Sequence, residues 1–182
     1  MRLFLDCEFT GLHQHTTLIS MALFAGDDCY FYAEFNDYNR EQVTDWLEAN
    51  VISKLKFPNE AGFSAVAGKR VEIKAGLPEV AATLATWLKH FAQVEIWADV
   101  LAYDWVLFCE LFGGALNVPS NIFYAPFDLA TLFYREGHIE PVNNYEKDIS
   151  RYQYAGANEA LRHNALEDAR VEKLCYDKLV AG

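Results

Sequence analysis

Residues 3–12 read Leu-Phe-Leu-Asp-Cys-Glu-Phe-Thr-Gly-Leu, an apolar, strand-like stretch that contains two carboxylates. Because side chains alternate between the faces of a strand, Asp6 and Glu8 leave one face while Leu5 and Cys7 leave the other. Burying two like charges costs free energy unless cations or hydrogen-bond donors compensate them, and a divalent metal ion does so most simply. The alternative is an edge strand with a solvated polar face. The pair alone favours neither.

Two more strand-like stretches follow, at residues 17–24 and 29–35, with the turn-forming Gly26-Asp27-Asp28 between them. These three stretches predict an antiparallel meander. After it, helical and strand-like patterns alternate. We expect helices at 39–55, 77–91, 102–112, 128–135 and 164–179, strands at 93–98 and 121–125, and loops at 57–70 and 137–156. The order predicts an α/β fold in a single domain over residues 1–182.

The composition excludes several classes of protein. With 52% hydrophobic residues in 182, the chain can bury a core and is not intrinsically disordered. No apolar run is long enough to span a membrane, and the N-terminal apolar stretch is too short for a secretory signal. The sequence therefore predicts a soluble, cytoplasmic protein.

Charge and cysteine usage narrow the partners and cofactors. Fifteen basic residues against 26 acidic ones give a net charge of −11, which repels a long polyanion unless cations intervene. The cysteines are scattered without a C-x-x-C pair, so neither a zinc site nor a disulfide framework is indicated. They are Cys7, Cys29, Cys109 and Cys175, and we expect them to be reduced and mostly in the core.

A third carboxylate lies where a buried strand gives way to a helix, in the segment Trp97-Ala-Asp-Val-Leu-Ala-Tyr-Asp-Trp105. Asp104 falls in the first turn of that helix, and the carboxyl ends of parallel strands face clefts. The alternative is that Asp104 stabilises the N-terminus of its helix, a common role for a lone aspartate. Asp99 competes for either role.

The fourth candidate group is His163-Asn-Ala-Leu-Glu-Asp-Ala-Arg170. Asn164 and Glu167 have capping-box spacing, so the helix starts at Asn164. Asp168 is then fixed in the first turn, while His163 lies outside on freer backbone. That placement suits an aspartate that holds a metal ion and a histidine that takes a proton from water. The alternative is a surface histidine beside an ordinary helical aspartate.

Together these motifs resemble the DEDDh, or DnaQ-like, superfamily of 3′–5′ exonucleases. Its D-x-E-x-T-G-L motif matches residues 6–12, and its H-x-A-x-x-D-A motif matches residues 163–169. The second motif is looser, because members often have His-Asn where this chain has Asp99-Val100, although Asp104 keeps the matching place. Histidine at position 163 favours the h branch over the y branch.

The resemblance implies an RNase H-like fold, in which a mixed sheet combines the antiparallel meander with parallel strands and carries helices on both faces. It implies two Mg²⁺ ions, for which Mn²⁺ can substitute, and an in-line displacement at phosphorus. The implied ligands are Asp6, Glu8, Asp104 and Asp168, the implied general base is His163, and the implied substrate-binding residues are Thr10, Gly11 and Leu12.

The resemblance implies release of 5′-mononucleotides from the 3′ end of RNA, and the acidic surface favours a short or single-stranded substrate over a long duplex. In size the chain resembles oligoribonucleases and single-domain 3′-exoribonucleases. A homodimer is expected from the resemblance to such small relatives and from the 15% aromatic content. Three alternatives stay open: a proofreading-like DNA 3′–5′ exonuclease, a non-catalytic RNase H-like nucleic-acid-binding module and an α/β enzyme that uses a nucleotide cofactor. The last is the least favoured, because the sequence contains neither a G-x-G-x-x-G motif nor a P-loop.

Other polar and aromatic residues have simpler interpretations. We expect His13 and His15 at the surface, Trp97, Trp105 and Phe108 in the core, and Asp128 as a helix N-cap. A cluster before the last motif suits either substrate contact or a mobile charged loop. Its members are Tyr145, Lys147, Arg151, Tyr152, Tyr154 and Arg162.

Overall fold

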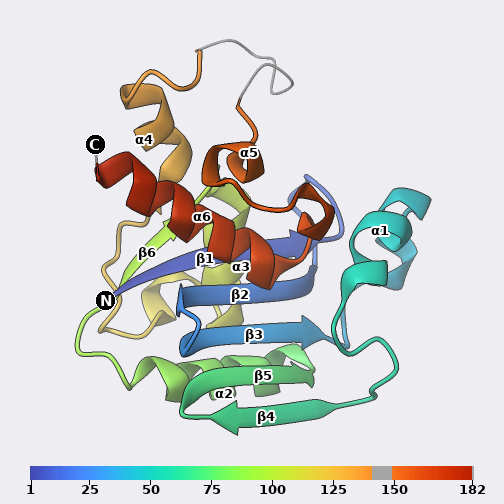
Figure 1. The fold of residues 1–182 in the computed structure, drawn as a ribbon. Helices are drawn as coiled ribbons and strands as arrows, with labels where there is room; N and C mark the ends of the chain where they lie inside the picture. The colour runs from blue at the N-terminus through green and yellow to red at the C-terminus, as the bar shows by residue number, and fades with distance from the viewer. Residues whose placement is uncertain (141–148, 182) are drawn as a thin grey trace.

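The computed structural model describes residues 1–140 and 149–181, and its described residues form one seven-stranded mixed sheet (Figure 1). The strand order across the sheet is β4-β5-β3-β2-β1-β6-β7. The strands are β1 (Arg2–Phe9), β2 (Leu18–Gly26), β3 (Cys29–Phe35), β4 (Phe63–Ala67), β5 (Lys69–Ala75), β6 (Glu95–Ala98) and β7 (Phe127–Asp128). This arrangement is a mixed α/β architecture, consistent with an RNase H-like fold.

The predicted meander is confirmed, and β1 lies inside the sheet. β1 pairs antiparallel with β2 and parallel with β6, while β2 pairs antiparallel with β3. Because β1 has a neighbour on each side, the interpretation of the Asp6/Glu8 strand as a solvated edge is wrong. The parallel pairing of β6 with β7 extends the sheet beyond it.

The predicted loop at 57–70 is wrong, because most of it belongs to a β-hairpin. β4 pairs antiparallel with β5, and β5 pairs parallel with β3 along its length. Gly68, with φ of 66°, turns the chain between the two strands. Prolines and glycines indicated a loop, whereas the edge of β3, distant in sequence, supplies the hydrogen bonds that make strands here.

The predicted continuous helix at 39–55 is also wrong. The segment holds a 3₁₀ turn at Arg40–Gln42, the helix α1 (Asp45–Asn50) and a second 3₁₀ turn at Ile52–Lys54. The Thr44 side chain accepts a hydrogen bond from the Leu47 amide and so starts a new helix inside the expected one. The spacing of four between apolar residues indicates which side chains pack against the core. It does not indicate where a capping side chain ends one helix and starts another.

Four further helices follow the predicted pattern, with ends shifted by a few residues. They are α2 (Leu77–Leu88), α3 (Ala102–Leu111), α4 (Leu129–Arg135) and α6 (Ala165–Val180). Asp128 caps α4 as predicted, through the Thr131 amide. The predicted strand at 121–125 reduces to a single bridge between Ile122 and Val94. The helix α5 (Arg151–Ala155), which the Ser150 side chain caps, was not predicted, so the predicted loop at 137–156 is wrong over these residues. Residues 141–148 of that loop are outside the described residues.

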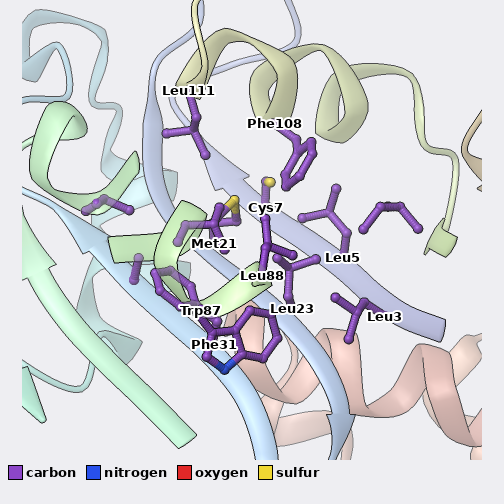
Figure 2. Packing of buried hydrophobic residues seen from close by; sticks show 14 of the residues in the cluster. Leu3, Leu5, Cys7, Met21, Leu23, Phe31, Trp87, Leu88, Phe108 and Leu111 are labelled. Atoms are coloured by element: carbon purple, nitrogen blue, oxygen red, sulfur yellow. The ribbon is translucent and has the colours of Figure 1, made fainter. Parts of the chain in front are cut away.

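Helices cover both faces of the sheet, and the two faces differ. On one face, Leu3, Leu5 and Cys7 of β1 pack with residues of α2 and α3 in the largest hydrophobic cluster. Figure 2 shows Leu5, Cys7, Leu88 and Phe108 in this cluster. On the other face, α6 crosses β1 and β2 in front of the sheet (Figure 1).

The minor expectations about exposure hold. Phe108 is buried, Trp97 and Trp105 pack against the hydrophobic clusters, and His13 and His15 are exposed. All four cysteines are free thiols, and three of them are buried. Within residues 1–140 and 149–181, no helix has both the length and the apolar character needed to cross a bilayer.

Candidate active site

The structure brings together three of the predicted carboxylates, from the central strand and from the helix that crosses it. Asp6 and Glu8 leave the same face of β1, and Asp168 faces them from the first turn of α6. One oxygen from each of these residues lies within 4.8 Å of the others. Oδ2 of Asp6 and Oδ2 of Asp168 are buried without a hydrogen-bond partner among the described residues. Such unpaired oxygens are costly unless a cation binds them.

Burial raises the pKa of every carboxyl group in this cluster, and repulsion from neighbouring carboxylates raises the pKa of Asp6 and Glu8 further. The pKa of Asp6 lies well above its usual value, first because of burial and then because of Asp168 and Glu8. For the same leading reason, the pKa of Glu8 rises to about 8 and that of Asp168 to about 6. Protonation of the site therefore competes with cation binding near neutral pH.

Asp104 lies beside the cluster, in the first turn of α3 as predicted. Its Oδ1 accepts a hydrogen bond from the Cys7 amide of β1 at 2.8 Å, which ties the start of α3 to the central strand. Burial raises the pKa of Asp104 to about 7. Its charge in turn raises the pKa of both Asp6 and Glu8. Asp104 thus shares the electrostatic field of the three converging carboxylates.

His163 lies on the same side of the sheet, just before α6. Asn164 caps α6 by accepting a hydrogen bond from the Glu167 amide, as the capping-box spacing predicted. The Nδ1 atom of His163 is 3.8 Å from Oε1 of Glu8. Burial lowers the pKa of His163, and the charges of Arg162 and Lys54 lower it further. A neutral imidazole next to the carboxylates can accept a proton at physiological pH.

Comparison with known proteins identifies the family. A family model described as the 3′-5′ exoribonuclease Rv2179c-like domain matches residues 1–179. Two curated relatives from Mycobacterium tuberculosis, the 3′-5′ exoribonucleases Rv2179c of strain H37Rv and MT2234.1 of strain CDC 1551, are each 30% identical over 122 residues. The match covers 67% of this chain and 67% of each relative. The chain belongs to the Rv2179c-like 3′–5′ exoribonuclease family.

Membership confirms the resemblance on which the sequence interpretation rested, and it shows a 3′–5′ exoribonuclease. The family implies RNA as the substrate, against the alternatives of a DNA exonuclease and a non-catalytic module. In this exoribonuclease the cluster of Asp6, Glu8 and Asp168 could hold a metal ion. Carboxylate oxygens are the ligands that Mg²⁺ and Mn²⁺ prefer, so the donor set fits the expected cofactor.

Beside the four predicted carboxylates of the exoribonuclease lies a buried one that the sequence interpretation missed. Glu172, 4% exposed, lies one turn after Asp168 on α6, and its Oε1 accepts a hydrogen bond from the Asp99 amide at 2.9 Å. Burial raises the pKa of Glu172 well above its usual value, followed by the charges of Asp99 and Asp104. The four-residue spacing from Asp168 was the available signal, because it places both side chains on one helix face.

Asp99, which competed with Asp104 in the sequence, lies in a different environment. Its Oδ2 is 2.9 Å from Nε of Arg151. The exoribonuclease thus uses Arg151, a member of the predicted basic and aromatic cluster, to neutralise Asp99. This ion pair sets Asp99 apart from the three carboxylates that converge on each other.

Tyr152, expected either in substrate contact or in a mobile loop, is a buried partner of the acidic cluster. Its hydroxyl group donates a hydrogen bond to Oδ1 of Asp168 at 2.8 Å, and the residue is 4% exposed. The contact orients one oxygen of Asp168 and leaves Oδ2 unpaired. No sequence spacing indicated it. Tyr145 and Lys147 lie outside the described residues.

The predicted substrate-binding residues form the turn after β1. The Thr10 hydroxyl is buried, donating to Oε1 of Gln42 and accepting from the Thr17 amide at 2.9 Å. The Gly11 amide donates to Oγ1 of Thr16 at 3.0 Å. Leu12 is 77% exposed. Thr10 and Gly11 therefore shape a turn that presents Leu12 to solvent.

Proposed function

We propose that this exoribonuclease releases 5′-mononucleotides from the 3′ end of short or single-stranded RNA, with two Mg²⁺ ions at the acidic cluster. Mn²⁺ is expected to substitute. The observation that carries the proposal is the convergence of Asp6, Glu8 and Asp168 within 4.8 Å, with buried oxygens that have no partner among the described residues. Asp104 completes the proposed ligand set. When bound, the ions supply Lewis-acid stabilisation of the charge that develops on the phosphate and on the leaving oxygen.

His163 is the proposed general base. Its imidazole is neutral at physiological pH, because burial and two nearby cations lower its pKa. It takes a proton from the attacking water, whose oxygen forms the new bond to phosphorus. The bond from phosphorus to the 3′ oxygen of the preceding nucleotide breaks, and that oxygen leaves with the electron pair and then takes a proton from solvent.

Substrate end recognition is assigned to the turn after β1. Leu12 is exposed and can pack against the 3′-terminal nucleotide, while Gly11 lets the backbone approach a sugar closely. Thr10 supports this turn from inside through Gln42 and Thr17. The net charge of −11 favours a single 3′ end over a long duplex.

The homodimer stays a prediction, and a monomer mass by light scattering would overturn it.

The polarity and the metal dependence can be tested in one assay. Linear RNA oligomers labelled at the 5′ end should shorten stepwise from the 3′ end with Mg²⁺ present, releasing 5′-mononucleotides. Matched DNA oligomers should react more slowly, circular RNA should survive, and excess EDTA should stop the reaction. Internal cleavage of the circle, or full activity in EDTA, would contradict the proposal.

The role of His163 has its own test. His163→Ala should lower kcat by about 10²–10⁴-fold, the usual contribution of a positioned acid–base group. Mn²⁺ affinity, measured by calorimetry, should stay near that of the wild type. The exposed His15 provides the control, because His15→Ala should retain activity. A loss of Mn²⁺ binding in His163→Ala would make the residue a metal ligand instead.

A further inference from the structure

The backbone of His163 needs support from outside its own segment. Its φ of 67° lies in the left-handed region, which residues with a Cβ adopt rarely. The residue lies between a 3₁₀ turn at Glu159–Leu161 and the first residue of α6, Ala165, so neither helix includes it. An unusual conformation persists only where the surroundings hold it, and such positions cluster at functional sites.

Lys54 contacts the chain on both sides of His163. Its Nζ donates a hydrogen bond to the carbonyl oxygen of Arg162, the preceding residue. Its own carbonyl oxygen accepts a hydrogen bond from Nδ2 of Asn164, the following residue, at 3.0 Å. One residue, far away in sequence, thus holds both neighbours of His163.

Both ends of this contact are themselves anchored. Lys54 closes the 3₁₀ turn at Ile52–Lys54, next to Val51, which is 1% exposed in a small hydrophobic cluster. Asn164 uses both atoms of its amide, because Nδ2 bonds to Lys54 while Oδ1 caps α6 through the Glu167 amide. The contact therefore joins a packed segment to the fixed start of α6.

The same segment also touches the His163 ring. Trp46 of α1 meets the imidazole edge-on, with the ring centroids 5.1 Å apart. The ammonium of Lys54 is close enough to lower the pKa of both His163 and Glu8. Trp46 thus contacts the ring of His163, while Lys54 contacts the residues on either side of it.

We propose that Lys54 is a positioning residue for the hydrolysis of RNA, holding His163 in its left-handed conformation beside Glu8. The inference rests on the proposed role of His163 as general base. A direct phosphate contact is the competing role, since lysine ammonium groups bind phosphates. The hydrogen bond of Nζ to a backbone carbonyl favours positioning, because it directs the charge toward the protein.

The test compares three substitutions at one position. Lys54→Met removes both the donor and the charge, Lys54→Gln keeps a donor without the charge, and Lys54→Arg keeps both. We expect Lys54→Met to lower kcat on an RNA oligomer by about 10–100-fold, as a misplaced catalytic group does. KM and the calorimetric Mn²⁺ affinity should change less than about twofold, and Lys54→Arg should recover most of the rate. Lys89→Met, at the end of α2 on the other face of the sheet, is the control.

A double-mutant cycle decides whether Lys54 acts through His163. In a His163→Ala background, Lys54→Met should cause almost no further loss of kcat. The positioning role would be overturned if the losses of kcat in the two single variants multiply in the double variant. It would also be overturned if Lys54→Met raises KM at unchanged kcat or lowers the Mn²⁺ affinity. If Lys54→Met does not fold, the cycle is run with Lys54→Gln, for which the same outcomes decide. Full activity of His163→Ala would instead contradict the proposed general base, so the two failures are distinguishable.

Discussion

The two faces of β1 carry opposite solutions to the same problem, the burial of a central strand. On one face, Leu3 and Leu5 are fully buried against α2 and α3, where apolar side chains pack against each other and need no polar partner. On the other face, Asp6 and Glu8 are held beneath α6 with Asp168, and burial raises the pKa of all three carboxyl groups. The first face stabilises the fold, while the second is completed only by protons or cations.

From this difference we expect adjacent residues of β1 to serve stability and the proposed activity separately. Leu5 and Asp6 are consecutive residues of β1, yet Leu5 belongs to the hydrophobic core and Asp6 to the acidic cluster. Substitutions on the two faces should therefore affect different measurements.

The largest effect is expected from the acidic face. Asp6→Asn should lower kcat by at least about 10³-fold, since the metal contributes several kcal/mol to the transition state. The same variant should unfold at a higher temperature than the wild type in EDTA, because it removes a buried, repelling charge. An RNA hydrolysis assay measures kcat, and scanning calorimetry of the same sample measures the unfolding temperature. Unchanged activity would remove Asp6 from the proposed ligands.

The apolar face should give the reverse pattern. Leu5→Ala should lower the free energy of unfolding by about 2–5 kcal/mol, as deletion of a buried leucine side chain usually does. At a temperature where the variant is still folded, its kcat on RNA should stay within about threefold of the wild type, because the cluster on the other face is intact. Urea unfolding and initial rates measure the two quantities. A loss of kcat as large as in Asp6→Asn would break the division.

The acidic face also sets a pH dependence with a definite sign. In the folded state the pKa of Asp168 is about 6, that of Asp104 about 7 and that of Glu8 about 8, all above their usual values of 3.8, 3.8 and 4.5. The folded protein therefore binds more protons than the unfolded chain, and this stability, complete below about pH 4, is lost as pH rises to about 8.

Urea unfolding in EDTA at about pH 5 and about pH 8 tests that sign, with an expected difference of a few kcal/mol. Mg²⁺ should restore stability more at the higher pH, where the carboxylates are ionised. The Asp6→Asn variant is the control, because it should show a weaker dependence. Equal stability at both pH values would show that the carboxyl groups are not buried as described.

The smallest effect is expected at Glu172. Glu172→Gln keeps the oxygen that accepts from the Asp99 amide and removes a buried charge, so stability in EDTA should hold or rise. Glu172→Ala leaves that amide unpaired and should cost about 1–3 kcal/mol. Thermal unfolding of both variants compares them. If Gln and Ala are equally destabilised, the charge of Glu172 matters more than its hydrogen bond.

Local patterns predicted the fold and the site where neighbouring residues decide the structure. Alternation in residues 3–12 placed Asp6 and Glu8 on one face, and the cap at Asn164 placed Asp168 inside α6. The hairpin of β4 and β5 escaped prediction because its partner, β3, is distant in sequence. Tyr152 and Lys54 escaped for the same reason, since their contacts with Asp168 and with the neighbours of His163 exist only after folding.

Mn²⁺ titration by calorimetry at about pH 8 tests whether the acidic face of β1 binds the proposed catalytic metal. We expect Mn²⁺ to bind the wild type and Leu5→Ala with similar affinity, and binding to be lost in Asp6→Asn. Equal Mn²⁺ affinity in Asp6→Asn and in the wild type would show that this face does not bind the metal through Asp6.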